Sequence, residues 1–266
     1  IGTAPDGLSF EDKLLLAYRS GCDWFQPFDI SLPGDRVHAD TPFHFGPAVF
    51  DLVTAPALLD LVETLIGPEI TSNPIQHIRI KPPSNRLADD EIRAHITATD
   101  WHQDRGVTLP EADHTAMVTC WCAITDATVQ NGCLQVIPGA HHEGLKPHCP
   151  RTQLTLANGV FDYSAAVPLP VRAGGVVCLH PLTPHSSLVN RSEGIRWSFD
   201  LRYNVTGQPT GRPHFPSFVA RSRKDPSNIL ASGAAWHALW QEARVRLAAQ
   251  PHIDLYRWDG DAAVCA

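Results

Sequence analysis

The sequence predicts a mainly β fold with flanking helices, of the sandwich or jelly-roll type. Short apolar segments between residues 75 and 204 are separated by turn-forming residues, as in antiparallel sheets. Stretches with helical spacing or helix-type ends lie before and after this region. The chain has 266 residues, 43% of them hydrophobic and 18% charged, which suits one globular domain.

Three segments are predicted to be helices: 9–20, 55–66 and 234–249. The segment 55–66 has the clearest ends, because Pro56 suits a first helical turn and Gly67 suits a helix end. The apolar residues of the last segment repeat at helical spacing: Trp236, Leu239, Trp240, Ala243 and Leu247.

Five segments are predicted to be strands, because each is apolar or alternating and is bounded by Pro, Gly or Asn: 75–81, 117–124, 133–137, 176–180 and 195–204. Residues 84–99 and 205–233 are predicted to be irregular. We therefore expect a single domain over 1–266, with a helical or extended part, a jelly-roll core, and an irregular loop with a closing helix: 1–74, 75–204 and 205–266.

Composition excludes some classes of function. The 28 acidic and 21 basic residues give a net charge of −7, which argues against a nucleic-acid surface. No apolar run reaches the roughly 18–20 residues of a membrane span, and Ile1–Asp6 lack signal-peptide features. The seven cysteines lack zinc-site spacing, so we expect reduced thiols and a cytoplasmic location. The expected partner is a small-molecule substrate, with no nucleic acid and no membrane; the oligomeric state is not predicted.

Three residues form a candidate metal site. On a strand, His102 and Asp104 would point to the same face, because side chains alternate. With His185 they make two imidazoles and one carboxylate, the donor set that binds non-haem iron(II) and leaves positions open. His180 competes with His185, but the spacing to Arg196 favours His185.

Arg196 is a candidate anion-binding residue. It follows His185 by eleven residues on the predicted strand 195–204. A guanidinium there can form a bidentate pair with a cosubstrate carboxylate. Arg191 competes but falls in a turn, and Arg202 competes because it shares strand parity with Arg196.

Several motifs occur together in the middle of the chain: WHQD at 101–104, Trp121, NGCLQVIPGAH at 131–141, GLKPH at 144–148, HPLTPHSS at 180–187 and Arg196. In this order they resemble the phytanoyl-CoA dioxygenase family. The resemblance implies a double-stranded β-helix (jelly-roll) core, Fe(II), and 2-oxoglutarate and O2 as cosubstrates.

By position, the resemblance implies that His102, Asp104 and His185 bind the metal and are catalytic, and that Arg196 binds 2-oxoglutarate. It also implies cosubstrate contacts for Trp121 and Ser187, for which an apolar core and a turn are the ordinary alternatives. Gln76 is a further expected cosubstrate contact. Lys81 is expected to reach solvent and Gln103 to support the metal site. Expected substrate contacts are Arg79, Arg105 and His95.

The expected activity is hydroxylation of a small organic molecule, with decarboxylation of 2-oxoglutarate to succinate. Asp104 favours hydroxylation, because related halogenases carry a small residue there. One alternative is a jelly-roll protein that binds a metal or ligand without turnover, and another is a zinc hydrolase using the same three residues. Arg196 favours the oxygenase. The sequence does not identify the substrate, nor whether it is a CoA ester.

Overall fold

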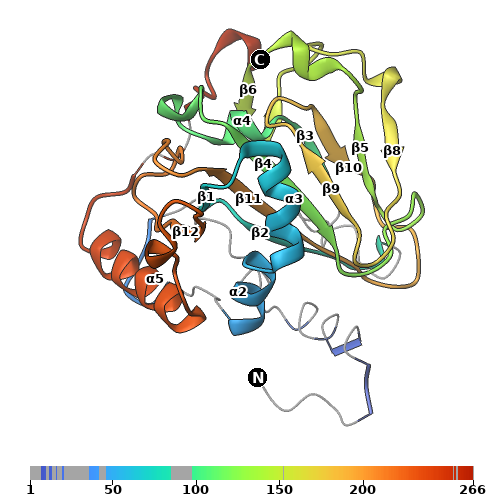
Figure 1. Cartoon of the computed structure of the whole chain (residues 1–266). Helices are drawn as coiled ribbons and strands as arrows, with labels where there is room; N and C mark the ends of the chain where they lie inside the picture. The colour runs from blue at the N-terminus through green and yellow to red at the C-terminus, as the bar shows by residue number, and fades with distance from the viewer. Residues whose placement is uncertain are drawn as a thin grey trace.

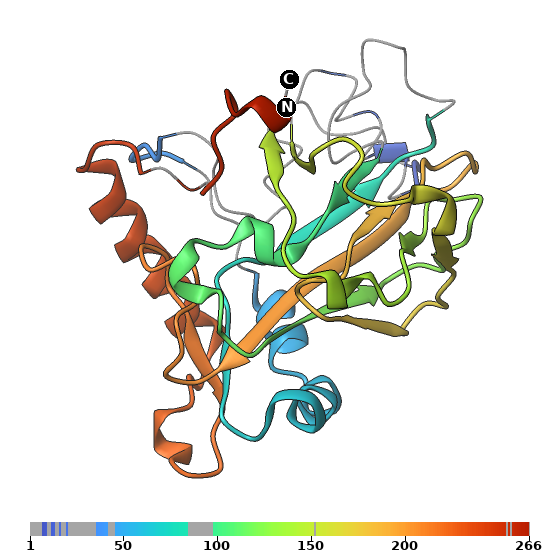
Figure 2. The same cartoon turned by 90° about the horizontal axis from the view of Figure 1, so that it is seen from above.

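The computed structural model describes residues 36–41, 46–84, 98–151, 153–253 and 257–265, with 7–9, 12, 13, 16, 20 and 255. It is a jelly roll of two antiparallel sheets, as the sequence predicts (Figure 1). The long strand β11 (Arg196–Val205) runs through the middle of the molecule (Figure 2).

The larger sheet has six strands. Its order is β12 (Phe218–Arg221), β1 (Ile70–Ser72), β11, β4 (Met117–Ala123) and β9 (Val176–Leu179), and β2 (His77–Lys81) also pairs with β11.

The second sheet has the order β3 (Thr99–His102), β10 (His185–Ser187), β5 (Leu134–Val136) and β8 (Val167–Leu169). A separate pair consists of β6 (His148–Pro150) and β7 (Leu154–Leu156). Short helical turns connect the strands: α4 (Asp104–Val107), η4 (Pro110–Ala112), η5 (Ala140–Glu143), η6 (Tyr163–Ala165), η7 (Pro226–Asn228) and η8 (Ala263–Cys265).

Strand β11 has two chemically different faces, because side chains alternate along a strand. One face carries Phe199, Leu201 and Tyr203, which pack into the main hydrophobic core. The other face carries polar and charged side chains toward the space between the sheets: Arg196, Ser198, Asp200 and Arg202. This alternation places the polar groups opposite β10 and beside β2 and β4.

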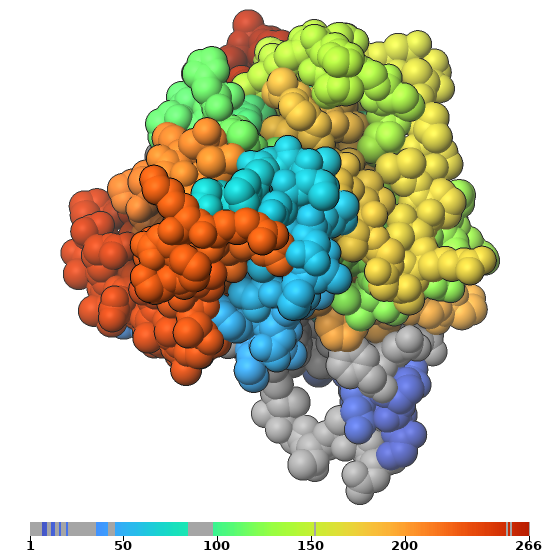
Figure 3. Space-filling view, in the orientation of Figure 1, coloured from blue at the N-terminus to red at the C-terminus, as the bar shows by residue number. Residues whose placement is uncertain are grey.

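Helices cover the apolar face of the larger sheet. They are α2 (Pro47–Val53), α3 (Pro56–Ile66) and α5 (Gly233–Ala248). The Tyr203 hydroxyl donates to the Val53 carbonyl at 2.8 Å, which ties β11 to α2. In the space-filling view α3 and the chain around β12 lie against each other (Figure 3), where Arg221 forms an ion pair of 2.8 Å with Glu63.

The structure confirms the strongest secondary-structure predictions. The segment 55–66 forms α3, 234–249 forms α5, and the five predicted strands are β2, β4, β5, β9 and β11 with ends shifted by a few residues. The region 205–233 was wrongly predicted to be wholly irregular, because it contains β12. The helix predicted at 9–20 lies mostly outside the described residues, as does most of the loop 84–99.

The cysteine prediction needs a correction. Cys149 and Cys265 form a disulfide across 116 positions of sequence, with Cα atoms 5.5 Å apart. Spacing along the chain could not reveal this pair, because only folding brings Cys149 of β6 next to Cys265 of η8. Cys120, Cys122, Cys133 and Cys178 are free thiols. The disulfide does not favour the expected cytoplasmic location, which stays a prediction. No helix within the described parts of the chain is long and apolar enough to cross a membrane.

Candidate active site

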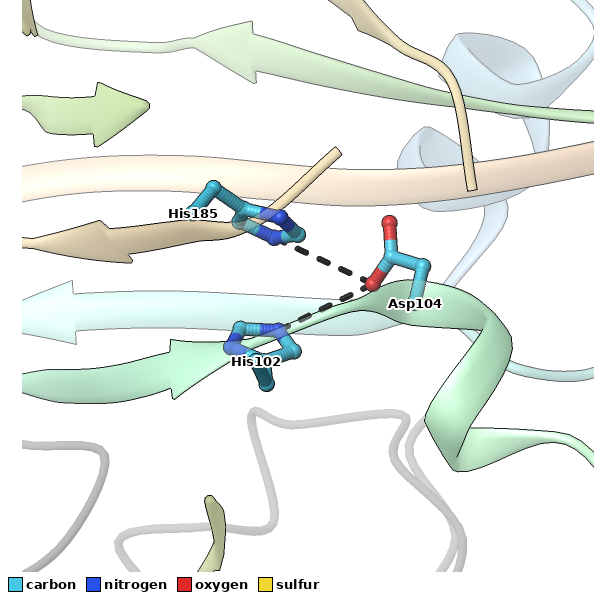
Figure 4. Close-up of side chains that lie close together, drawn as sticks. All are labelled: His102, Asp104 and His185. Atoms are coloured by element: carbon cyan, nitrogen blue, oxygen red, sulfur yellow. Dashed lines mark ion pairs between the residues drawn. The ribbon is translucent and has the colours of Figure 1, made fainter. Parts of the chain in front are cut away.

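His102, Asp104 and His185 converge at one end of the polar interior (Figure 4). His102 ends β3 and lies opposite His185 of β10, and the ring centroids are 4.2 Å apart. The prediction that Asp104 shares a strand with His102 is wrong, because β3 ends at His102 and Asp104 begins α4. The extended backbone of Gln103 (φ −112°, ψ 134°) still leaves both side chains on one side.

Hydrogen bonds determine which imidazole nitrogen is free to bind a metal. Nδ1 of His102 lies 2.8 Å from the Asp100 carbonyl, and Nδ1 of His185 lies 2.9 Å from the Thr183 carbonyl. A carbonyl can only accept, so each Nδ1 carries the proton and each Nε2 keeps its lone pair. Burial, and then the neighbouring His185, lowers the pKa of His102 well below its ordinary value, which keeps this ring neutral.

The distances suit one shared ion. Nε2 of His102 lies 3.7 Å from Oδ1 of Asp104, and Nε2 of His185 lies 3.9 Å from the same oxygen. Two ligand atoms that each bind one ion at about 2.1 Å are at most about 4.2 Å apart. Within the described part of the chain, no other group of three such side chains has this arrangement.

The Asp104 carboxylate is held by the larger sheet. The Thr119 hydroxyl donates to Oδ2 at 2.6 Å, and Nη2 of Arg202 donates to Oδ1. Thr119 and Arg202 are register partners on β4 and β11. Burial alone would raise the pKa of Asp104, but Arg202, the two histidines and Thr119 hold that pKa well below its usual range. Arg202 faces inward, and it contacts this carboxylate.

Arg196 lies at the other end of β11 and is almost completely buried. Its Nη1 donates to the Ser198 hydroxyl at 2.6 Å, and its guanidinium carbon lies 5.4 Å from the centre of the Trp121 ring. Its Nε has no hydrogen-bond partner among the described residues. Burial lowers the pKa of Arg196 to about 10, so the side chain remains charged at neutral pH.

Lys81 corrects a prediction, because we had expected it to reach solvent. It is fully buried and lies opposite Arg196 in the β2–β11 register. Its Nζ donates to the Ser187 hydroxyl, which also accepts from the Thr99 amide at 2.9 Å. Burial, followed by the charges of Arg196 and Arg79, lowers the pKa of Lys81 well below its ordinary value. Lys81 follows Arg79 by two positions on β2, so strand alternation already placed it on the same side as that expected pocket residue.

A single pocket joins the triad to Arg196. Its space, part of which is open to solvent, is about 350 Å³. The lining includes the metal-binding candidates and four more of the predicted site residues: Arg79, Trp121, Ser187 and Arg196. The positions that the sequence predicted separately are therefore brought together around one space.

Three predicted site residues are not placed there. Gln76 is buried beside Trp236 and Trp240, and its Nε2 donates to the Ser72 hydroxyl at 2.6 Å. Arg105 binds backbone carbonyls of the next turn, with Nη2 at 2.7 Å from the Thr115 carbonyl, so it stabilises that turn instead of facing the pocket. His95 lies outside the described residues. The competing ligand His180 is exposed, and its Nδ1 accepts from the Leu182 amide at 3.2 Å.

Gln103 lies in the chain between His102 and Asp104, and its support of the metal site stays a prediction. Its fully buried side chain donates to the Gly144 and Leu182 carbonyls at 2.9 and 2.7 Å and accepts from the Lys146 amide at 2.8 Å. Its backbone amide donates to Nε2 of His148 at 2.9 Å. The sequence alone indicates no role for His148, although this residue ends the GLKPH motif.

Comparisons with known proteins identify a family for this chain. The model of the family "Phytanoyl-CoA dioxygenase (PhyH)" matches residues 30–198. The peroxisomal phytanoyl-CoA dioxygenase of Homo sapiens is 31% identical over 162 residues, which cover 58% of this chain and 45% of that protein. A probable phytanoyl-CoA dioxygenase of Caenorhabditis elegans is 29% identical over 167 residues, covering 59% of this chain and 51% of that protein. The chain thus spans about half the length of these curated relatives.

Solved structures support the fold. The apo form of the non-heme monooxygenase ThoJ superposes with a TM-score of 0.56 at 21% identity, covering 75% of each chain. The epimerase SnoN in complex with Fe3+, alpha ketoglutarate and nogalamycin RO has a TM-score of 0.50 at 24% identity, covering 62% of this chain and 63% of that chain. At these identities the likeness concerns the fold.

Proposed function

The chain belongs to the phytanoyl-CoA dioxygenase family of Fe(II)- and 2-oxoglutarate-dependent oxygenases, and from this premise we propose that it hydroxylates a small organic molecule while 2-oxoglutarate is decarboxylated to succinate. One observation carries the proposal. A single pocket has two imidazole nitrogens and a carboxylate at one end and a buried guanidinium at the other. A site that only stores metal has no need for the second end.

His102, Asp104 and His185 would hold the iron. The donor set suits Fe(II), because two neutral imidazoles and one carboxylate leave coordination positions for a bidentate oxoacid and O2. Bound iron supplies the activation of O2. The protein's own contribution is to keep both Nε2 lone pairs available and to keep Asp104 ionised through Arg202 and Thr119. The carboxylate ligand favours hydroxylation over halogenation.

The cosubstrate would bind with its far carboxylate at Arg196. A buried guanidinium with an unused Nε–H is suited to donate to a carboxylate. Lys81 and the Ser187 hydroxyl lie beside this position and add a second cation and a hydrogen-bonding group. A carboxylate there would favour the charged form of Lys81, which burial disfavours. The Trp121 ring packs against the guanidinium and keeps it in place.

Arg79 and Asp200 are the residues we propose for substrate recognition. Nε of Arg79 lies 3.1 Å from Oδ2 of Asp200, and both residues line the pocket. Oδ1 of Asp200 is buried and has no hydrogen-bond partner in the described structure. A substrate hydroxyl or amine would satisfy this oxygen, since leaving a buried acceptor unpaired costs about 1–3 kcal/mol. This supports a polar small molecule as substrate.

The deciding experiment is a substrate screen by succinate release. The purified protein with Fe(II), 2-oxoglutarate and candidate substrates should form succinate and product in equal amounts. His102→Ala should abolish both, whereas Arg191→Met, an exposed arginine outside the pocket, should not. A protein that binds Fe(II) and 2-oxoglutarate but never forms succinate would be the non-catalytic alternative. Hydrolysis with Zn(II) and no 2-oxoglutarate would identify the hydrolase alternative.

A further inference from the structure

His148 is a buried histidine with a defined tautomer. It begins β6 and is 1% exposed. Its Nδ1 lies 2.9 Å from the Lys146 carbonyl, which can only accept, so Nδ1 carries the proton. Its Nε2 therefore has a free lone pair, and it accepts the backbone N–H of Gln103 at 2.9 Å. The ring thus acts as an acceptor toward residues 102–106, which we call the metal-binding loop.

Gln103, whose amide donates to His148, lies between two metal-binding candidates. Gln103 is fully buried and separates His102 from Asp104. Without the His148 ring, the backbone amide of Gln103 would have no partner, because the chain leaves β3 after His102 and has no strand neighbour there among the described residues. The ring also fits closely beneath the turn that follows, since a Cβ at Gly106 would overlap the His148 ring. The imidazole therefore sets both the position and the spacing of this loop.

The C-terminal segment holds His148 from the other side. The Trp258 ring lies 5.2 Å from the His148 ring, and its Nε1 donates to the Gly106 carbonyl at 2.7 Å. Cys149, next to His148, is joined to Cys265 by the disulfide. Both cartoon views place the C-terminal segment beside β6 (Figures 1 and 2). Residues 257–265 thus contact the metal-binding loop from more than a hundred positions away.

We propose that His148 is a positioning residue for the metal site, and that residues 257–265 brace it through Trp258 and the disulfide. The inference rests on the proposed function, because it requires that His102, Asp104 and His185 bind a metal. Burial lowers the pKa of His148 to about 4, so the ring is neutral at neutral pH and can accept the Gln103 amide. Groups behind metal ligands commonly change metal affinity by about 10–100-fold when they are removed.

The test measures Co(II) affinity of the whole chain by anaerobic calorimetry, together with the melting temperature. His148→Phe keeps a ring but cannot accept, and we expect Co(II) binding about 10-fold weaker or more. His148→Gln should recover most of the affinity, because its Oε1 can accept the Gln103 amide. Leu156→Ala is the matched control: Leu156 is buried opposite His148 on β7, and its loss should lower the melting temperature but change affinity less than about twofold.

Two variants test whether residues 257–265 brace His148. Trp258→Phe keeps a ring but removes the donor to Gly106, and Cys265→Ser removes the disulfide to Cys149. Each should weaken Co(II) binding several-fold, less than His148→Phe does. Wild-type affinity in both variants would overturn the bracing role. Three results would overturn the positioning role. They are wild-type Co(II) affinity in His148→Phe, equal losses of Co(II) affinity in His148→Phe and Leu156→Ala, or no recovery of affinity in His148→Gln.

Failure of the proposed function has a different signature. If the wild-type chain binds neither Co(II) nor Fe(II), the metal site itself is refuted and this inference falls with it. If the wild-type chain binds metal and the His148 variants do so equally well, only the inference is refuted.

Discussion

Replacing Arg196 with methionine would remove the buried guanidinium while keeping a side chain of similar length. Arg196 is 1% exposed, so the carboxylate that it binds would be desolvated as well. Removing one partner of a buried, hydrogen-bonded charge pair costs about 2–5 kcal/mol. Because each 1.4 kcal/mol is about tenfold in affinity, the Kd for 2-oxoglutarate should rise between about 30-fold and several thousand-fold. Lys81 remains beside the site, and because a bound carboxylate would favour its charged form, it favours the lower end of this range.

The assay uses the Co(II)-loaded protein under anaerobic conditions, so that no turnover occurs. Binding of 2-oxoglutarate is followed by calorimetry or by tryptophan fluorescence, since Trp121 lies 5.4 Å from the Arg196 guanidinium. Arg191→Met is the control, because Arg191 is an exposed arginine in the neighbouring turn. Arg196→Met should bind Co(II) normally and 2-oxoglutarate poorly. If its Kd for 2-oxoglutarate stays within about threefold of the wild-type value, less than about 0.7 kcal/mol, the assignment of Arg196 is refuted.

Three further predictions concern the metal loop and its support. Thr119→Val removes the hydroxyl that donates to Asp104 but keeps the shape, so Co(II) affinity should fall about 10-fold, and unchanged affinity by calorimetry would contradict this role. Burial lowers the pKa of His148 from an ordinary 6.5 to about 4, so the unfolded chain takes up a proton first as the pH falls. The contribution of neutral His148 to the free energy of unfolding should be complete above about pH 6.5 and should decline by about 3 kcal/mol toward about pH 4. In urea unfolding, the free energy of unfolding should therefore depend less on pH in His148→Gln than in the wild type. Cys265→Ser opens a disulfide between positions 116 apart, which should cost about 3 kcal/mol and lower the melting temperature by about 6–12 °C in scanning calorimetry. Wild-type protein treated with a thiol reductant should then have the same melting temperature as the variant. A remaining difference between the two melting temperatures would argue against the disulfide.

The elements that could be predicted are those whose local sequence already carries their hydrogen-bonding and packing pattern. Helix α3 begins at Pro56 and ends before Gly67, where φ is 88°, a conformation that glycine adopts easily. Strand β11 could be predicted because its alternation separates core residues from pocket residues. The short strands β1 and β6 have three residues each and no period to detect. They exist because β11 and β7 supply their partners.

The site residues also divide into those that could be predicted from the sequence and those that could not. The metal-binding candidates could be predicted because chemistry restricts the donor types and because His102 and Asp104 are two positions apart on an extended chain. Lys81 was misjudged because its neighbours along the chain say nothing about Ser187, which contacts it across 106 positions. Gln76 was misjudged for a different reason, since its partners Ser72 and Asn73 are only four and three positions away, but neither residue type indicates that it would draw the side chain away from the pocket.

The sequence by itself predicted a mainly β sandwich or jelly roll and, together with the family resemblance, His102, Asp104 and His185 as metal-binding candidates and Arg196 as the anion-binding candidate. These predictions depend on residue type and on the order of motifs along the chain, which the chain carries without folding. Only the tertiary structure decided that Lys81 is buried, that Arg202 contacts Asp104, and that His148 of β6 accepts the Gln103 amide. Each of these depends on which distant segments meet, and that outcome is set by packing of the whole core and not by any one segment.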